Sequence, residues 1–206
     1  MSGWNFDNKS NGDGQKKNFT KFPVGITHIR VLDEEPHVRW MHWMQKYNRG
    51  ITCPGKGCPI CEVRKRQKAN KEQYSVNMAR RLVMNIYNHE TNQVEIMEQG
   101  VTFFTDVKEM MLELKAEGKT LADVDLKVKR RGEGKDDTSY RIDLGKEFPL
   151  PEAIMKQIEE ERVENFEEFF QSPTEEQIIA LLNGEEWEAV FAKGDEGDDE
   201  APFEVE

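Results

Sequence analysis

Three cysteines within nine positions constrain this chain more than any other feature of its sequence. They stand in the segment Cys53-Pro-Gly-Lys-Gly-Cys58-Pro-Ile-Cys61. Its glycines and prolines permit the tight turn that brings Cys-x2-Cys ligands to one metal ion. A disulfide between two of the cysteines and a set of unreactive thiols are the alternatives. Unreactive thiols are usually buried among apolar neighbours, whereas this segment is polar. The segment therefore predicts a metal site, and soft thiolate ligands favour Zn²⁺.

A tetrahedral zinc site needs a fourth ligand besides the three thiolates. His37 and His42 both precede the cysteines, and we expect His42, which ends a predicted strand eleven residues before Cys53. His28 and His89 are expected to be ordinary strand and turn histidines. A catalytic zinc keeps an open position beside a general base, and no His-x-Glu motif precedes these cysteines. We therefore predict one structural Zn²⁺. Its ligands are His42, Cys53, Cys58 and Cys61.

The formal charge of −11 is unevenly distributed over the 206 residues. Residues 1–150 hold 26 Lys or Arg and 21 Asp or Glu, a formal +5. Residues 151–206 hold 3 Lys or Arg and 19 Asp or Glu, a formal −16. A basic body joined to an acidic end indicates two electrostatic roles. The alternative is that the acidic end only keeps the protein soluble.

The ends and the cysteine count predict a cytoplasmic protein. Three cysteines cannot all pair within one chain, and residues 1–14 lack the apolar core of a signal peptide. No apolar run approaches the ~20 residues needed to cross a bilayer, so no membrane partner is expected.

Hydrophobic periodicity predicts strands, a helix and further strands within the first 150 residues. Alternating patterns over 26–32, 38–43, 81–87, 94–97, 124–129 and 140–144 are typical of strands. Apolar residues at helical spacing over 103–114 indicate the helix, and the basic segment 62–73 is helical by propensity. We predict a mainly β fold with α: an OB-type five-stranded Greek-key barrel with a zinc-knuckle insertion. A generic α+β sheet protein would give the same pattern.

The chain divides into four predicted segments. These are a flexible polar arm (1–22), an OB-fold core with a zinc loop at 42–61 (23–150), C-terminal helices (151–192) and a disordered acidic tail (193–206). Within the helical segment, Ser172-Pro173-Thr174-Glu175 is interpreted as a capping box with proline at the first helical position, and Gly184 as the helix stop.

Basic and aromatic residues along the predicted strands indicate single-stranded nucleic acid as a partner, because cations follow phosphates and aromatic rings stack on bases. The candidate contact residues are Arg30, Arg39, Trp40, Trp43, Lys46, Tyr47, Arg49, Arg80, Arg81, Tyr87, Lys127, Lys129, Arg131 and Arg141. The period of two places Lys127, Lys129 and Arg131 on one face of their strand. It places Trp40 and Trp43 on opposite faces, so we expect at least one of them in the core. For any single residue the alternative is a solvated charged face.

The segment Ile29-Arg30-Val31-Leu32, the Trp/His strand after it and the motif Cys-Pro-x-x-x-Cys-Pro-Ile-Cys-Glu resemble the zinc-containing single-stranded-DNA-binding proteins of tailed bacteriophages. The resemblance covers roughly residues 20–145 and includes the hairpin from Gly132 to Tyr140. It implies an OB-fold core and a helix-destabilising role in DNA replication, recombination and repair, in the host-cell cytoplasm. It also implies zinc ligation by the three cysteines and His42.

Two further similarities concern the ends of the chain. The segment Lys16-Lys17-Asn18-Phe19-Thr20-Lys21 is similar to the basic arm that mediates cooperative self-association in that family. The segment Asp198-Asp199-Glu200-Ala201-Pro202-Phe203 resembles the acidic tip with which bacterial single-strand-binding proteins recruit partners. The second similarity implies that replication or recombination proteins contact Asp198, Asp199, Pro202 and Phe203. Competition of the tail with DNA for the basic body is the other role considered.

The sequence thus predicts a sequence-independent single-stranded-DNA-binding protein that is not an enzyme. One alternative is a zinc-knuckle interaction module or transcription regulator, for which 62–73 is the basic candidate helix. Another is a zinc-dependent nucleic-acid hydrolase. Against the hydrolase, the sequence lacks acids and histidines spaced for a second metal or a general base. The pattern leaves open the choice between DNA and RNA.

Overall fold

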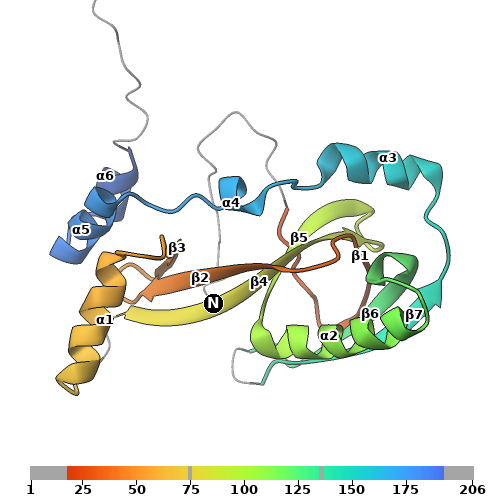
Figure 1. Ribbon diagram of the computed structural model, residues 1–206, viewed down its shortest axis with the longest axis horizontal. Coiled ribbons are helices and arrows are strands. Elements are labelled where there is room, and N and C mark those ends of the chain that lie inside the picture. Colours follow the sequence, from red (N-terminus) through yellow and green to blue (C-terminus); the bar gives the residue numbers. More distant parts are fainter. Residues whose placement is uncertain (1–17, 74–75, 135–136, 193–206) are drawn as a thin grey trace, which may run out of the picture. The chain divides into compact units, whose positions relative to one another are not determined.

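The computed structural model describes residues 18–73, 76–134 and 137–192. This part of the chain is a mixed α/β fold with an antiparallel sheet of seven strands and six α-helices (Figure 1). The strands hydrogen-bond in the order β3-β2-β4-β1-β6-β7, and β5 pairs with β4. The combination of β and α structure is therefore confirmed. The described strand ladders do not close into a barrel, since the strand path ends at β7 and β5 pairs with β4.

The chain forms two compact units. Unit 1 contains the described residues of 1–38 and 81–166, and unit 2 those of 39–80 and 167–206. The metal-bearing insertion is therefore longer than the predicted loop at 42–61. The predicted C-terminal helical segment is divided between the two units.

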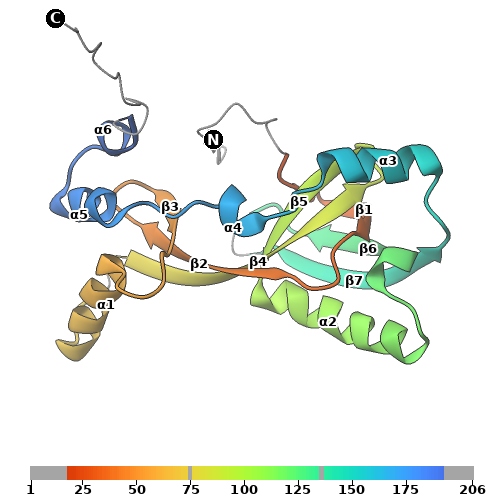
Figure 2. The ribbon, with the colours of Figure 1, turned by 45° about the horizontal axis from the view of Figure 1, so that its top comes forward.

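Unit 1 is a set of antiparallel strands with a helix on each side. Its elements are β1 (Gly25–Val31), β4 (Val76–Asn88, from Arg81), β5 (Gln93–Gly100), α2 (Val101–Ala116), the 3-10 turn η1 (Leu121–Asp123), β6 (Val124–Arg131), β7 (Ser139–Glu147) and α3 (Glu152–Glu161). Strand β1 lies between β4 and β6, so that Ile29 faces Asn88 on one side and Leu126 on the other. Helices α2 and α3 lie on opposite sides of these strands (Figure 2).

The main core of unit 1 follows from the alternation in the sequence. Ile29 of β1 and Leu126 and Val128 of β6 are fully buried, whereas Lys127 lies between the latter two on the outer face. Helix α2 adds Phe103 at helical spacing from the other buried residues of its stripe. Burial of each such side chain contributes about 1.5–3 kcal/mol to the free energy of folding. The strand face and the helix face that carry these residues therefore pack against each other.

Strand β4 is buried on both faces from Leu82 to Asn88, which its alternating sequence does not indicate. Its second face is covered because Tyr87 packs in a small cluster with Val94 of β5 and Ile158 of α3. Tyr87, a predicted nucleic-acid contact, is only 2% exposed. That prediction is wrong, because a buried ring cannot stack on a base.

Unit 2 has its own small core. Its elements are β2 (His37–Met44, from Arg39), β3 (Arg49–Thr52), α1 (Pro59–Ala69), the end of α4 (Phe166–Phe169), α5 (Glu175–Asn183) and α6 (Trp187–Ala192). Met44 and Ile60 are buried against Ile178, Leu181 and Val190 of the C-terminal helices. Helices α5 and α6 are therefore an integral part of unit 2.

The capping residue of helix α5 is Thr174, whereas the sequence predicted Ser172. The side-chain oxygen of Thr174 accepts from the backbone N–H of Gln177 at 3.2 Å, and Gln177 Oε1 accepts from the backbone N–H of Thr174 at 2.9 Å. These reciprocal bonds satisfy two helix-terminal N–H groups, so Thr174 is the cap and Pro173 precedes the helix. The stop at Gly184 is confirmed, because its φ of 95° is the left-handed value that favours glycine.

Arg30, another predicted nucleic-acid contact, is a buried structural residue of unit 1. It is 1% exposed, and its guanidinium donates to Asp125 Oδ1 at 2.8 Å, to the carbonyl oxygen of Ala122 at 2.7 Å and to that of Phe148 at 3.2 Å. The same carboxylate oxygen of Asp125 lies 2.9 Å from Nε2 of His89. With its donors directed inward, Arg30 cannot reach a phosphate, and the prediction is wrong.

We expect Asp125→Asn to lower the free energy of unfolding by about 3–5 kcal/mol, because it leaves the buried Arg30 charge without its counter-charge. The matched control is Asp143→Asn, which removes the exposed partner of Arg141 and is expected to cost less than about 1 kcal/mol. Urea unfolding followed by circular dichroism measures both. Equal effects of the two substitutions would contradict the structural role of the buried pair.

Candidate metal centre and basic surfaces

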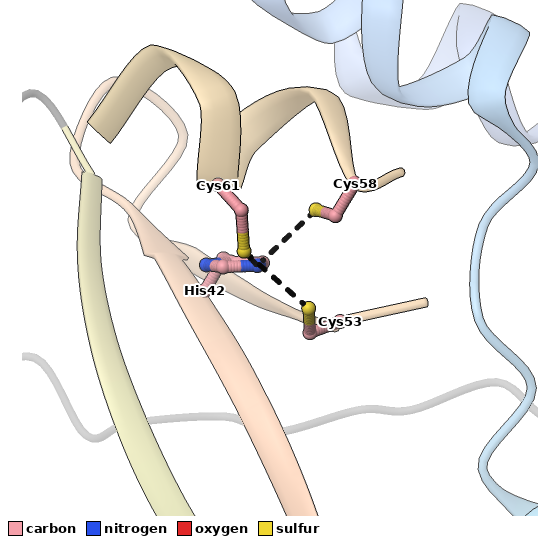
Figure 3. Close-up of side chains that lie close together, drawn as sticks. All are labelled: His42, Cys53, Cys58 and Cys61. Carbon is pink, nitrogen blue, oxygen red and sulfur yellow. Dashed lines mark hydrogen bonds between the residues drawn. The ribbon is translucent and has the colours of Figure 1, made fainter. Parts of the chain in front are cut away.

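The metal-binding residues are brought together by a strand, a turn and the start of a helix. His42 lies on β2, Cys53 directly follows β3, and the helical residue Cys61 follows Pro59, the first residue of α1. Between them, Gly55 and Gly57 have φ values of 84° and 82°, which residues with a Cβ rarely adopt. The four side chains point toward one another in Figure 3. The predicted loop at 42–61 is thus part strand, part turn and part helix.

The distances between the donor atoms fit one tetrahedral metal ion. Cys53 Sγ lies 3.8 Å from Cys61 Sγ, and His42 Nε2 lies 3.4 Å from Cys58 Sγ and 3.6 Å from Cys61 Sγ. All four donor atoms lie within 4.8 Å of one another. Tetrahedral Zn²⁺, with bonds of about 2.3 Å to sulfur and 2.05 Å to nitrogen, gives S···S of about 3.8 Å and S···N of about 3.6 Å. The cluster could hold one metal ion and is consistent with a zinc site.

The geometry bears on the disulfide alternative and on the choice of the fourth ligand. All three cysteines are free thiols, and a sulfur separation of 3.8 Å is far from the ~2.05 Å of a disulfide. His42 is the histidine of the cluster, whereas the ring of His37 lies 5.7 Å from that of Phe166. His28 and His89 pair with Glu90 and Asp125.

Burial sets the protonation of these ligands before a metal binds. It lowers the pKa of His42, as does the charge of Arg64, so the imidazole is neutral and its Nε2 is free to coordinate. Burial also raises the pKa of Cys53 and that of Cys61, the latter to about 12. Both thiols are therefore protonated at neutral pH, and a metal must displace their protons. Metal binding is accordingly expected to weaken as the pH falls.

Two features of the residues in the cluster bear on metal binding: a hydrogen bond to Cys53 and a buried nitrogen of His42 that has no hydrogen-bond partner among the described residues. The backbone N–H of Gly55 donates to Cys53 Sγ at 3.4 Å, a bond that stabilises negative charge on the sulfur. His42 is fully buried, and its Nδ1 is without a hydrogen-bond partner within the described part of the chain. With four protein donors the cluster is a closed set, the arrangement typical of structural rather than catalytic zinc.

In unit 1, the predicted basic face is present on β6. Lys127 and Lys129 are partly exposed and Arg131 is exposed, all three on the face opposite the buried Leu126 and Val128. Across the sheet, Lys129 faces Arg141 of β7. Arg141 is 70% exposed and pairs with Asp143, whereas Lys127, Lys129 and Arg131 make no ion pair with any described residue. We call Lys127, Lys129 and Arg131 the β6 basic row.

In unit 2, some of the predicted nucleic-acid contact residues are exposed, whereas others are engaged in contacts within the protein. Trp40 is 45% exposed, whereas Trp43 is half-buried and lies over Gly50 of β3. Arg39 is buried, with its guanidinium 3.9 Å from the ring centre of Phe170 and donating to Thr52 Oγ1. The prediction for Arg39 is therefore wrong, because its charge is directed into the fold.

Three further residues that were predicted to contact nucleic acid bind the C-terminal helices α5 and α6 instead. Lys46 Nζ donates to the carbonyl oxygen of Gly184 at 2.7 Å, and Arg49 forms an ion pair of 3.1 Å with Glu188. The hydroxyl of Tyr47 lies 2.8 Å from the carbonyl oxygens of Leu181 and of Glu185. These residues close the end of α5 in unit 2.

The remaining predicted residues lie at the boundary between the two units in the sequence or outside the described residues. Arg80 is exposed and Arg81 partly exposed on β4. The predicted partner-binding residues Asp198, Asp199, Pro202 and Phe203 lie outside the described residues, as do Lys16 and Lys17 of the arm. The following residues of the arm are described, and Phe19 forms a parallel bridge with Ile96 of β5.

One group of exposed cations was missed by the sequence-based search for contacts. It lies on α1, where Lys65, Arg66 and Lys68 are exposed. Alternation along strands does not reveal these residues, although the basic character of the helix is visible in the sequence. No helix among the described residues has the length and apolar character that a membrane span requires.

Comparison of the sequence with known protein families gave no match, and comparison with curated proteins gave none either.

We expect the purified protein to bind one equivalent of Zn²⁺ per chain, and His42→Ala to weaken binding more than about 100-fold. Loss of outer-shell partners alone costs about 10–100-fold, and His42 supplies a ligand atom. His37→Ala is the matched control and should leave the affinity unchanged. Competition with a chromogenic chelator measures all three proteins. Equal effects of the two histidine substitutions would contradict the proposed ligand set.

Proposed function

We propose that the protein binds single-stranded nucleic acid without sequence specificity and does not catalyse a reaction on it. The sequence resemblance favours DNA as this nucleic acid. Binding combines phosphate contacts with stacking of bases on an exposed aromatic ring. The observation that carries the proposal is the β6 basic row. The three cations lie on one strand face and form no ion pair with a described residue, although Lys127 faces Asp143 across the sheet, and they offer their charge to an external polyanion.

The exposed Trp40 supports a single strand rather than a duplex as the ligand. Trp40 is 45% exposed, which is unusual for so large an apolar residue. Bases present a free ring face for stacking only when they are not paired, and each stacked base contributes about 1–3 kcal/mol. A duplex offers phosphates but no such face.

The topology of unit 1 also supports the proposal. The strand order β5-β4-β1-β6-β7, with α2 between β5 and β6 in the chain, matches the ladders and helix position of an OB-type sheet. We accordingly propose that unit 1 is an OB-type domain, with residues 39–80 of unit 2 inserted after its first strand and the rest of unit 2 following it in the chain. The resemblance to zinc-containing phage single-stranded-DNA-binding proteins agrees with this assignment and with a role in replication, recombination or repair.

In this proposal the metal is a structural Zn²⁺ held by the closed set of His42, Cys53, Cys58 and Cys61. When bound, zinc supplies only a cross-link between β2, the cysteine turn and α1. The protein is accordingly not an enzyme. The acidic C-terminal residues would recruit partner proteins or compete for the basic row.

The test is a titration of tryptophan fluorescence with poly-dT at several salt concentrations, with a duplex control. Affinity for poly-dT should fall as salt rises, by a slope of about 0.7 per neutralised phosphate. The variant Lys127→Gln/Lys129→Gln should lower that slope by about 1.4, as two contacts are lost. The matched control, Lys108→Gln/Lys115→Gln, removes two exposed lysines from α2 and should leave the slope unchanged.

Absence of any response of the wild-type protein to poly-dT at low salt would refute the proposed function. Equal slopes for the β6 variant and the α2 control would refute the assignment of the β6 basic row. Duplex binding as tight as poly-dT binding would favour the interaction-module alternative.

A further inference from the structure

Helix α1 directs a group of cations outward that the metal centre does not use. Its inner face holds the buried Ile60 and packs with α5 of the same unit. Its outer face holds Lys65, Arg66 and Lys68. Two further exposed lysines flank the helix, Lys56 in the cysteine turn and Lys71 after the last turn. We call these five residues the α1 basic face.

The segment that contains this helix is strongly basic, whereas residues 167–192 of the same unit hold seven acidic residues and no Lys or Arg. Residues 39–80 contain ten Lys or Arg and two acidic residues, a formal +8. Three thiolates and one Zn²⁺ together would add −1, so the segment stays strongly positive when the metal is bound. A surface that needed only solubility would mix both signs.

Ion pairs within the protein account for little of this charge. Lys65 pairs with Glu62 on the same helix. Arg66, Lys68 and Lys71 form no ion pair with any residue that the structure describes. Arg66 and Lys68 lie in the last turn, where cations interact favourably with the helix dipole. That effect does not explain Lys56 or Lys71, which lie outside the helix.

The chemistry of this face favours a flexible polyanion over a membrane. A membrane-binding helix combines cations with exposed Trp, Phe or Leu that enter the lipid. None of the exposed large apolar residues in the described chain lies on α1. The exposed side chains of the helix are instead polar or charged, apart from Ala69 at its end.

We propose that the α1 basic face is a second contact surface for the phosphate backbone of single-stranded nucleic acid. It lies on unit 2, and its residues are different from those of the β6 basic row on unit 1. The inference rests on the proposed function. Each of the two surfaces would contact phosphates from its own unit.

The test uses the full, zinc-loaded chain and the poly-dT titration over 50 to 200 mM salt. Arg66→Gln/Lys68→Gln should lower the salt slope by about 1.4, which makes the affinity loss over this range about sevenfold smaller than in the wild type. A second variant, Lys56→Gln/Lys71→Gln, lies outside the helix and should act in the same direction. Lys108→Gln/Lys115→Gln on α2 is the control. One zinc per chain in each variant shows that the metal unit is intact.

The outcomes separate this inference from the proposed function. Failure of the wild type to bind poly-dT would overturn both. A reduced slope for the β6 variant, with wild-type slopes for both α1 variants, would overturn the inference alone. Binding of phosphatidylserine vesicles that is lost in the α1 variants, with unchanged poly-dT slopes, would overturn it in favour of a membrane surface.

Discussion

The convergence of His42, Cys53, Cys58 and Cys61 on one point is the constraint on which unit 2 depends. The main core of unit 1 comprises 16 buried residues in its described part, whereas that of unit 2 comprises eight. A core of eight residues is small for an independently stable unit, and structural metals commonly supply what such cores lack. Metal ligation would cross-link β2, the cysteine turn and α1, the elements on which α5 and α6 pack. The positions of Trp40 and of the α1 cations therefore depend on this centre.

Electrostatics then explains why the acidic C-terminal part belongs to the metal unit. Residues 167–192 contain seven acidic residues and no Lys or Arg, whereas residues 39–80 are strongly basic. The contacts of Lys46 and Arg49 with the ends of α5 and α6 use part of this complementarity. Lys46 and Arg49 nevertheless stay exposed. The β6 basic row and the α1 basic face are the two groups of cations that we propose for contact with an external ligand.

The sequence predicted the features that local chemistry determines. The cysteine spacing and the strand pattern before it were sufficient to name the four residues of the cluster that could hold a metal ion, and the alternation in β6 correctly separated Lys127 from Leu126. It did not distinguish an outward arginine from a buried one. Arg30 and Arg39 alternate correctly for an exposed face, but Arg30 meets Asp125 about ninety residues later in the chain, and Arg39 meets the ring of Phe170. Such long-range partners leave no periodic signal. The short strand β3 and the sharing of one core by α1 and α5 were missed for the same reason.

The most direct test of the proposed function is photo-crosslinking of the zinc-loaded protein to a thymidine oligonucleotide containing 4-thiothymidine, followed by peptide mapping. If Trp40 is the stacking ring and β6 follows the phosphates, crosslinks should occur at Trp40 and within Val124–Arg131, and excess unlabelled poly-dT should abolish them. Crosslinks confined to α2 or α3, or none at saturating oligonucleotide, would contradict the proposed binding surface.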